Sequence, residues 1–216
     1  PGPRLHAPHR DLELGPVEIE LSADQVDVRP VGALREVTRG QFHGLGHGVV
    51  DVDRAALLDG GLAAWKSAGL PLSTEAVERP GRDLAVKVRP NLIADRDEVL
   101  AAIDDDTVAL IDVMPEAHFR GEMSMYARPG HISGAVNSPV MDLLNESGRF
   151  RPQDELAELL SGDQETRTIT YCGGGIAASA TAFVMTRLGF TDVAVYTASL
   201  QEWAAEPTNP MEVGSD

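Results

Sequence analysis

The sequence predicts an α/β fold in which a central, mainly parallel sheet is flanked by helices on both faces. Three short apolar runs carry this prediction: TVALIDV (107–113), TITYC (168–172) and DVAVY (192–196). Each is rich in β-branched residues and lacks polar alternation, which is typical of strands buried on both faces. Helical patterns lie between the runs. Strands that alternate with helices favour parallel pairing, with helices covering both sides of the sheet.

Three segments have the pattern of helices. DRDE (95–98) precedes an apolar run and resembles a capping box, so we expect a helix and a new domain to begin near residue 94. In PQDELAELLSG (152–162), the leucines placed on one helical face are Leu156, Leu159 and Leu160. In ASATAFVMTRLG (178–189), the residues placed on one face are Ala180, Phe183, Val184 and Leu188, with Gly189 as the expected C-cap.

An internal similarity suggests how the chain is divided. The octet LDGGLAAW (58–65) resembles YTASLQEW (196–203), with a leucine and a tryptophan in register about one domain apart. The segment between the copies that is rich in proline and charge is predicted to be a linker. We therefore expect a truncated or divergent copy over 1–72, the linker over 73–93, and a complete domain over 94–214.

The amino-terminal region has no clear alternation of strands and helices. Residues 1–50 contain four of the six histidines, and His43 and His47 have the spacing of a helical metal-binding pair. The glycines between those two histidines argue against a helix, so we favour a loop and predict no metal site. A first copy this short is not expected to build its own sheet. We therefore predict that residues 1–50 form a poorly ordered extension.

Composition limits the classes of partner and compartment. The chain has 216 residues and a formal net charge of −16, which opposes binding to nucleic acid and to anionic membranes. No apolar run approaches the length that spans a bilayer, and the first residues do not resemble a signal peptide. The single cysteine excludes an internal disulfide and a multi-cysteine zinc site. We expect a cytoplasmic protein without membrane or nucleic-acid partners.

The single cysteine lies between a predicted strand and a predicted helix. Cys172 is followed by Gly173, Gly174 and Gly175, and the helix is expected from Ala177 or Ala178. Glycines allow unusual backbone angles and close approach, so the N–H groups of this loop could converge on an anion at the helix N-terminus. Such a loop favours a thiolate and suits covalent cysteine catalysis. A buried core cysteine beside a tight turn is the open alternative.

Other chemistries that use glycine loops or cysteines fit the sequence less well. The loop lacks the G-x-G-x-x-G spacing of dinucleotide-binding turns and the lysine of a P-loop. A cysteine phosphatase needs an arginine six residues after the cysteine, where this chain has Ala178. A Cys–His protease is disfavoured because, although His118 and His131 are available, a glycine-rich loop at a strand end is the wrong setting.

Residues 94–214 resemble the rhodanese (sulfurtransferase) domain. Four motifs occur in the family's order: VALIDVMPEAHFRGE, RPGHISGAVNSP, YCGGGIAAS and VYTASLQEW. The cysteine loop is most similar to that of 3-mercaptopyruvate sulfurtransferases. LDGGLAAWKSAGLP resembles the closing segment of an amino-terminal rhodanese domain in tandem members of the family.

The resemblance implies a rhodanese-like sheet and a sulfur-transfer reaction. Cys172 would take a sulfane sulfur from thiosulfate or 3-mercaptopyruvate as a persulfide. Cyanide, a small thiol or a redox protein would then accept it, without a cofactor or a metal. The residues implied to hold the persulfide are Gly173, Gly174, Gly175, Ile176 and Ala177. The alternative is a non-catalytic rhodanese-like module that carries sulfur or binds a partner, since the loop lacks charged residues. The sequence leaves the oligomeric state open.

Departures from the family concern the residues that would bind substrate. Met114 and His118 stand where the family has arginines, and the cysteine loop contains no arginine or lysine. The expected substrate-binding residues are Arg128, as the strongest candidate, with His118 and Arg120. Asp112 is expected to support the loop and the end of the sheet.

Overall fold

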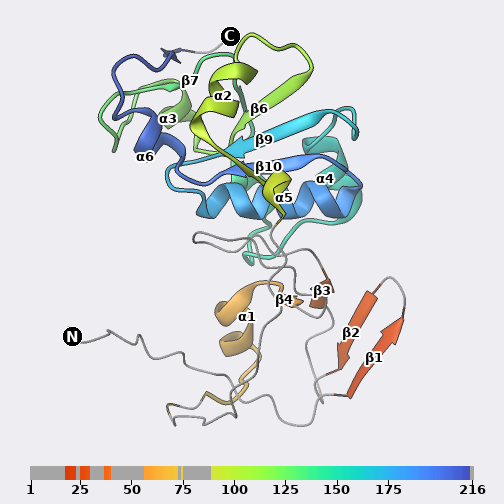
Figure 1. The fold of residues 1–216 in the computed structure, drawn as a ribbon. Coiled ribbons are helices and arrows are strands. Elements are labelled where there is room, and N and C mark those ends of the chain that lie inside the picture. The colour runs from red at the N-terminus through yellow and green to blue at the C-terminus, as the bar shows by residue number, and fades with distance from the viewer. Residues whose placement is uncertain are drawn as a thin grey trace, which may run out of the picture. The chain divides into compact units, whose positions relative to one another are not determined.

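The computed structural model (Figure 1) describes residues 57–72, 74 and 89–214, together with strand backbones at 18–22, 25–29, 37–39 and 56–58. These residues fall into two compact units, an amino-terminal one that ends before residue 75 and a carboxy-terminal one over 89–214. Each unit is described by itself. Most of the predicted linker lies outside the described residues.

The amino-terminal unit contains an antiparallel sheet of four strands in the order β1-β2-β3-β4. The strands are β1 (Glu18–Ser22), β2 (Gln25–Arg29), β3 (Val37–Arg39) and β4 (Ala56–Leu58), and helix α1 (Gly61–Ser67) follows them. The prediction that a first copy this short builds no sheet of its own is wrong, because these four strands pair with one another. EIELS and QVDVR alternate polar and apolar residues, which is typical of antiparallel strands, whereas continuous apolar runs are typical of buried parallel strands. His43 and His47 lie outside the described residues.

The carboxy-terminal unit is built on five parallel strands in the order β5-β10-β9-β6-β8. Their bounds are β5 (Ile93–Ala94), β6 (Val108–Asp112), β8 (Val136–Asn137), β9 (Arg167–Tyr171) and β10 (Val193–Tyr196). A short antiparallel pair joins β7 (His131–Ile132) to β11 (Met211–Glu212). The predicted central parallel sheet is confirmed, and the three strands read from apolar runs are β6, β9 and β10.

Helices cover both faces of this sheet, as predicted. Their bounds are α2 (Arg96–Ala102), α3 (Glu116–Phe119), α4 (Gln153–Leu159), α5 (Ile176–Leu188) and α6 (Ser199–Trp203), with 3-10 helices η1 (Pro90–Leu92) and η2 (Val140–Leu143). Figure 1 shows α4 and α5 on one side of the sheet and α2 and α6 on the other. Among the described residues, no helix has the length and apolar character needed to cross a membrane.

The helix boundaries largely follow the signals in the sequence. The Asp95 carboxylate accepts the Glu98 N–H at 2.9 Å and caps α2, as the capping pattern predicts. Helix α5 begins at Ile176, one to two residues earlier than expected, and Gly189 ends it with a φ of 103°. Residues 90–93, assigned to the linker from sequence, form η1 and the start of the edge strand β5, because Ile93 pairs with Val195.

The core of this unit lies between the sheet and its helices. Tyr171, Tyr196 and Trp203 are among the largest fully buried side chains. The predicted apolar face of α4 is partly wrong, because Leu159 is 44% exposed although Leu156 and Leu160 are buried. Leu159 is the last residue of the helix and Leu160 has a non-helical backbone, so the helical face predicted from the sequence does not continue to the end of the segment.

The topology brings the functional candidates to one edge of the sheet. Parallel strands end at the same edge, where ligands of open α/β sheets bind. Asp112 ends β6, Cys172 directly follows β9, and Thr197 directly follows β10. These strands are neighbours, so the three residues lie side by side at their carboxyl ends.

Candidate active site

Cys172 is buried at the beginning of the loop that leads from β9 to α5. Its side chain is only 3% exposed, and the Gly175 N–H donates a hydrogen bond to its sulfur at 3.1 Å. The first N–H groups of α5, at residues 176–178, have no acceptor within the helix and form its positive end. Both features favour negative charge on the cysteine sulfur.

The glycines of the loop have different structural requirements. Gly175 has a φ of 83°, and a Cβ atom on it would lie 2.7 Å from the Thr197 carbonyl oxygen, so the position needs glycine. Gly174 is exposed, and the nearest atom to a Cβ there would be 3.6 Å away, on Gln201. Of the remaining predicted loop residues, Ile176 is 69% exposed and Ala177 is half-buried.

Ser199 holds the backbone of the cysteine and was not singled out from the sequence. Its hydroxyl accepts the Cys172 N–H at 3.1 Å and donates to the Tyr196 carbonyl at 2.6 Å. It is also the one described non-glycine residue with a positive φ, 52°. Two further bonds, from Leu200 N–H to the Cys172 carbonyl and from Gln201 N–H to the Gly173 carbonyl, join α6 to the loop at 3.0 Å. The start of α6 therefore fixes the cysteine.

Asp112 is fully buried at the end of β6. One carboxylate oxygen, Oδ1, accepts the Met114 N–H at 2.8 Å, whereas Oδ2 has no hydrogen-bond partner among the described residues. Burial raises the pKa of Asp112 to about 6, against the opposing effect of the Met114 N–H. The Tyr171 hydroxyl also lies close enough to favour the charged form, although its geometry at Oδ2 falls short of a hydrogen bond. These contacts agree with the supporting role predicted for Asp112, which stays a prediction.

The structure gives Arg128 a different role from the predicted one. Its guanidinium group donates to the backbone carbonyls of Trp203, Ala204, Glu206, Pro207 and Asn209, at 2.7–3.5 Å. The side chain thus caps the end of α6 and the turn after it. A guanidinium has five N–H donors, and this many carbonyl contacts leaves it little capacity for a substrate anion. These bonds disfavour substrate binding by Arg128, which stays a prediction.

The other two predicted substrate residues lie near α3, which follows β6 at the active-site edge. Arg120 forms an ion pair with Glu116, one helical turn earlier, and His118 is half-buried. Within residues 89–214, no hydrogen bond or ion pair links either side chain to the cysteine loop. Their contact with substrate stays a prediction.

His131 has the structural role expected of it. Its Nδ1 lies 2.7 Å from the Phe119 carbonyl oxygen, and a carbonyl can only accept, so Nδ1 carries the proton. The imidazole also stacks on the Phe119 ring at a centroid distance of 3.6 Å. Its other nitrogen, Nε2, lies 3.8 Å from a carboxylate oxygen of Glu212, so both ring nitrogens have partners other than Cys172.

Tyr126 is a residue of the site that the sequence analysis missed. A Cβ atom on Gly173 would overlap the Tyr126 hydroxyl and lie 2.8 Å from its Cζ, so the phenol sits directly against the residue after the cysteine. Tyr126 belongs to the segment GEMSMYARPG, between α3 and β7. That segment has neither strand nor helix periodicity, and its sequence therefore carries no signal that it reaches the loop.

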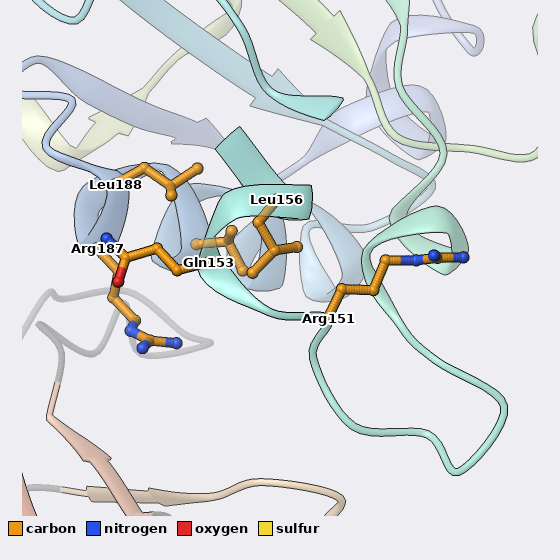
Figure 2. Close-up of a pocket in the computed structure, with 6 residues that line it drawn as sticks. Arg151, Gln153, Leu156, Arg187 and Leu188 are labelled. Carbon is orange, nitrogen blue, oxygen red and sulfur yellow. The ribbon is translucent and has the colours of Figure 1, made fainter. Parts of the chain in front are cut away.

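A small pocket lies elsewhere, between α4 and α5 (Figure 2). Its lining includes Leu156 of α4 and Arg187 and Leu188 at the end of α5. Figure 2 shows the guanidinium groups of Arg151 and Arg187 pointing away from each other, so they do not form one anion site. Because α5 begins at Ile176, the pocket lies about 18 Å along the helix from the cysteine loop.

Comparison with known proteins gives the same picture of the carboxy-terminal unit. Residues 95–206 match the family model of the rhodanese-like domain. A 3-mercaptopyruvate sulfurtransferase of Escherichia coli is 31% identical over 167 residues, 74% of this chain and 59% of the relative. A Mycolicibacterium smegmatis protein assigned as a thiosulfate sulfurtransferase is 41% identical over 172 residues, 74% of this chain and 61% of the relative.

Among solved structures, the anaerobic ergothioneine biosynthesis enzyme of Chlorobium limicola, in complex with trimethyl histidine, superposes with a TM-score of 0.69. The match covers 77% of this chain and 43% of that chain, at 23% sequence identity, and shows a shared fold. The chain spans about three fifths of the length of the curated relatives it matches. The family model covers just over half of the chain and includes the cysteine loop, so the protein belongs to the rhodanese-like domain family.

Proposed function

We propose that the protein is a sulfurtransferase that moves a sulfane sulfur from a donor to a thiophilic acceptor through a persulfide on Cys172. The observation that carries the proposal is the Gly175 N–H directed at the Cys172 sulfur, at the N-terminus of α5. The names of the relatives at 31–41% identity support the same reaction and give two donor classes, thiosulfate and 3-mercaptopyruvate.

The reaction has two steps on one sulfur atom. In the first, the Cys172 thiolate attacks the donor's outer sulfur, and the bond between that sulfur and the rest of the donor breaks. The electron pair leaves with sulfite, or with the pyruvate enolate, which then takes a proton. In the second, an acceptor such as cyanide or a thiolate attacks the terminal persulfide sulfur. The S–S bond breaks and the Cys172 thiolate leaves.

The loop is proposed to hold the charge that develops on the transferred sulfur. N–H groups that already point at a site stabilise a negative charge without reorganising during the reaction. Gly173, Gly174, Gly175, Ile176 and Ala177 would supply this cradle, and Ser199 would keep Cys172 at its base. His118 and Arg120 are proposed contacts for the rest of the donor.

Steady-state kinetics test this proposal. With thiosulfate or 3-mercaptopyruvate as donor and cyanide as acceptor, we expect thiocyanate and parallel double-reciprocal plots, because the enzyme alternates between free and persulfide forms. Cys172→Ser should be inactive, and Leu159→Ala, at an exposed position of α4 outside the cysteine loop, is the control that should fold and turn over normally. Intersecting plots, or turnover by the serine variant, would refute the mechanism.

The same assay addresses the alternative of a non-catalytic sulfur carrier. A carrier would form no thiocyanate from either small donor, yet would accept a persulfide sulfur from a cysteine desulfurase. That pair of results would replace the proposed function with the carrier function. The predicted cytoplasmic location is a separate proposal, for which the net charge of −16 and the single cysteine are the support.

A further inference from the structure

The Tyr126 phenol lies against Gly173, the residue that follows the cysteine. The position that a Gly173 Cβ would occupy is taken by the Tyr126 hydroxyl. Gly173 is therefore glycine because the phenol needs its space, and its φ is not in the left-handed region. This contact places a side-chain hydrogen-bond donor beside Gly173, in a loop whose own donors are backbone N–H groups.

The hydroxyl is both available and protonated. Among residues 89–214, the hydroxyl has no hydrogen-bond partner, although the Tyr126 backbone makes two hydrogen bonds. Partial burial raises the pKa of Tyr126, and the negative charges of Cys172 and Asp112 raise it further. The phenol therefore keeps its proton over the physiological range, and a neutral phenol can donate one hydrogen bond. No basic side chain of the described site competes for this role at the loop.

The segment that carries Tyr126 is fixed to the element that also fixes the cysteine. The Ser124 hydroxyl lies 3.1 Å from the Tyr126 carbonyl and accepts the Tyr126 N–H at 3.2 Å. Two residues later, Arg128 is bonded to the carbonyls at the end of α6. Helix α6 begins at Ser199, which binds Cys172. Tyr126 and the cysteine are thus positioned by the two ends of one short helix.

We propose that Tyr126 donates a hydrogen bond to the terminal sulfur of the Cys172 persulfide, as the side-chain member of the cradle. This proposal rests on the proposed function, because it concerns the persulfide intermediate. No covalent bond to Tyr126 forms or breaks, and its proton stays on the phenol oxygen. A neutral donor stabilises a terminal sulfur with one negative charge, and it replaces the loop cation that this chain lacks.

The expected effects follow from the energy of a hydrogen bond to a charged group. Losing such a bond costs a factor of about ten or more in an equilibrium or a rate. Tyr126→Phe keeps the ring and removes only the hydroxyl. We expect persulfide formation to slow about tenfold in a single turnover. The titration midpoint of the persulfide, followed by its near-ultraviolet absorbance, should rise by about one pH unit, because the anion loses a donor.

The experiment compares the full-length protein with Tyr126→Phe and Tyr196→Phe. Tyr196→Phe is the matched control, because its hydroxyl bonds to Glu202 at 2.5 Å and not to the loop. A merely structural role of Tyr126 would lower thermal stability and leave the titration midpoint of the persulfide unchanged. An unchanged midpoint and rate in Tyr126→Phe would overturn the Tyr126 proposal alone. Absence of any persulfide in the unmodified protein would overturn the proposed function as well.

A second pair of variants tests the contact itself. Gly173→Ala should impair persulfide formation, because its methyl group overlaps the Tyr126 hydroxyl. Combining it with Tyr126→Ala removes the overlap, so the double variant should fold with the stability of Tyr126→Ala alone. Additive losses of stability in the double variant would show that the two residues do not touch, and would overturn the proposal.

Discussion

The octets 58–65 and 196–203 have the same local structure, although they belong to different compact units. Each follows a strand and opens a short helix, α1 or α6. At the start of the helix, Gly61 has a φ of 53° and Ser199, in register with it, has a φ of 52°. At its end, the indole N–H of Trp65 donates to Pro71 and that of Trp203 to Pro210, both at 2.9 Å. This shared geometry supports the proposed duplication.

The difference between the two octets lies at the left-handed position. Glycine adopts a positive φ at little cost, whereas a residue with a Cβ pays roughly 1 to 2 kcal/mol. Among the described residues, no atom lies within 4 Å of where a Gly61 Cβ would be, and no cysteine precedes residue 172 in the sequence. Ser199 has the same positive φ although it carries a Cβ, and its hydroxyl accepts a hydrogen bond from the buried N–H of Cys172. The unit with the cysteine thus keeps a costly feature that its counterpart lacks, as is common at functional sites.

The largest expected effect is the loss of stability on replacing Trp203, and replacing Trp65 in the other unit gives the comparison. The chain has two tryptophans, and each is buried in its own unit, so either variant leaves the other as the only indole probe. Trp203→Ala should destabilise the carboxy-terminal unit by about 3 to 5 kcal/mol, because it empties a fully buried site. Trp65→Ala should leave persulfide loading intact. Urea unfolding followed by far-ultraviolet circular dichroism measures the stability of the carboxy-terminal unit, and mass spectrometry measures persulfide loading. A loss of loading in Trp65→Ala would show that sulfur loading depends on the amino-terminal unit.

Asp112 is a second costly feature of the cysteine-bearing unit. Its pKa of about 6 in the folded protein exceeds the ordinary value of 3.8, so the folded state binds the proton more tightly than the unfolded state does. Its charge therefore lowers stability as pH rises from about 4 to 6, and the full cost of about 3 kcal/mol is present above pH 6.

Asp112→Asn tests this cost, because the amide oxygen can still accept the Met114 N–H. The variant should match the unmodified protein near pH 4 and exceed its unfolding free energy by up to about 3 kcal/mol at pH 7. Urea titrations across this range provide the measurement. Equal stability of the two proteins at both pH values would show that burial of the carboxyl has no energetic consequence.

Variants of Ser199 compare two energies, the cost of its positive φ and the stabilisation from its hydrogen bond to Cys172. Ser199→Ala keeps the strained φ and leaves the buried Cys172 N–H without its partner, which should cost about 1 to 3 kcal/mol. Ser199→Gly also loses the hydroxyl but relieves the strain, so it should be more stable than the alanine variant by about 1 kcal/mol. Chemical unfolding of both variants decides this. A glycine variant less stable than the alanine variant would show that Ser199 is not strained.

The smallest effect is expected at the counterpart position. Gly61→Ala meets no neighbouring atom, so it should cost only the conformational penalty of about 1 to 2 kcal/mol and leave sulfur transfer unchanged. The measurement is the unfolding of the amino-terminal unit, followed through Trp65 in a Trp203→Phe background. A stabilising effect would mean that the φ of 53° is not kept in solution.

The parts of the fold that were predictable from sequence are those with a local signal. Continuous apolar runs located β6, β9 and β10, and a capping carboxylate and a terminal glycine located the ends of α2 and α5. Strands of two residues, such as β7 and β11, have no periodicity to detect, and they exist only because they pair with distant partners. The strands β1 and β2 do have a local signal, the alternation of polar and apolar residues, but it differs from the continuous apolar runs that predicted β6, β9 and β10.

The site divides in the same way. Cys172 and its glycines were found because the loop is continuous in sequence, whereas Tyr126 and Ser199 reach it through tertiary contacts. Arg128 was predicted to bind substrate because it is an arginine next to the PGHI motif. Its guanidinium is instead occupied by the carbonyls after α6, 75 to 81 residues away in sequence. Long-range backbone acceptors of this kind leave no pattern in the sequence.

Mass spectrometry of the sulfur adduct tests the central claim most directly. The protein is incubated with thiosulfate or 3-mercaptopyruvate, and the peptide that contains Cys172 is analysed before and after treatment with cyanide. We predict that this peptide gains the mass of one sulfur atom, that cyanide removes it, and that the Cys172→Ser protein gains nothing. An adduct that persists in the serine variant, or a Cys172 peptide that stays unmodified with both donors, would contradict the account.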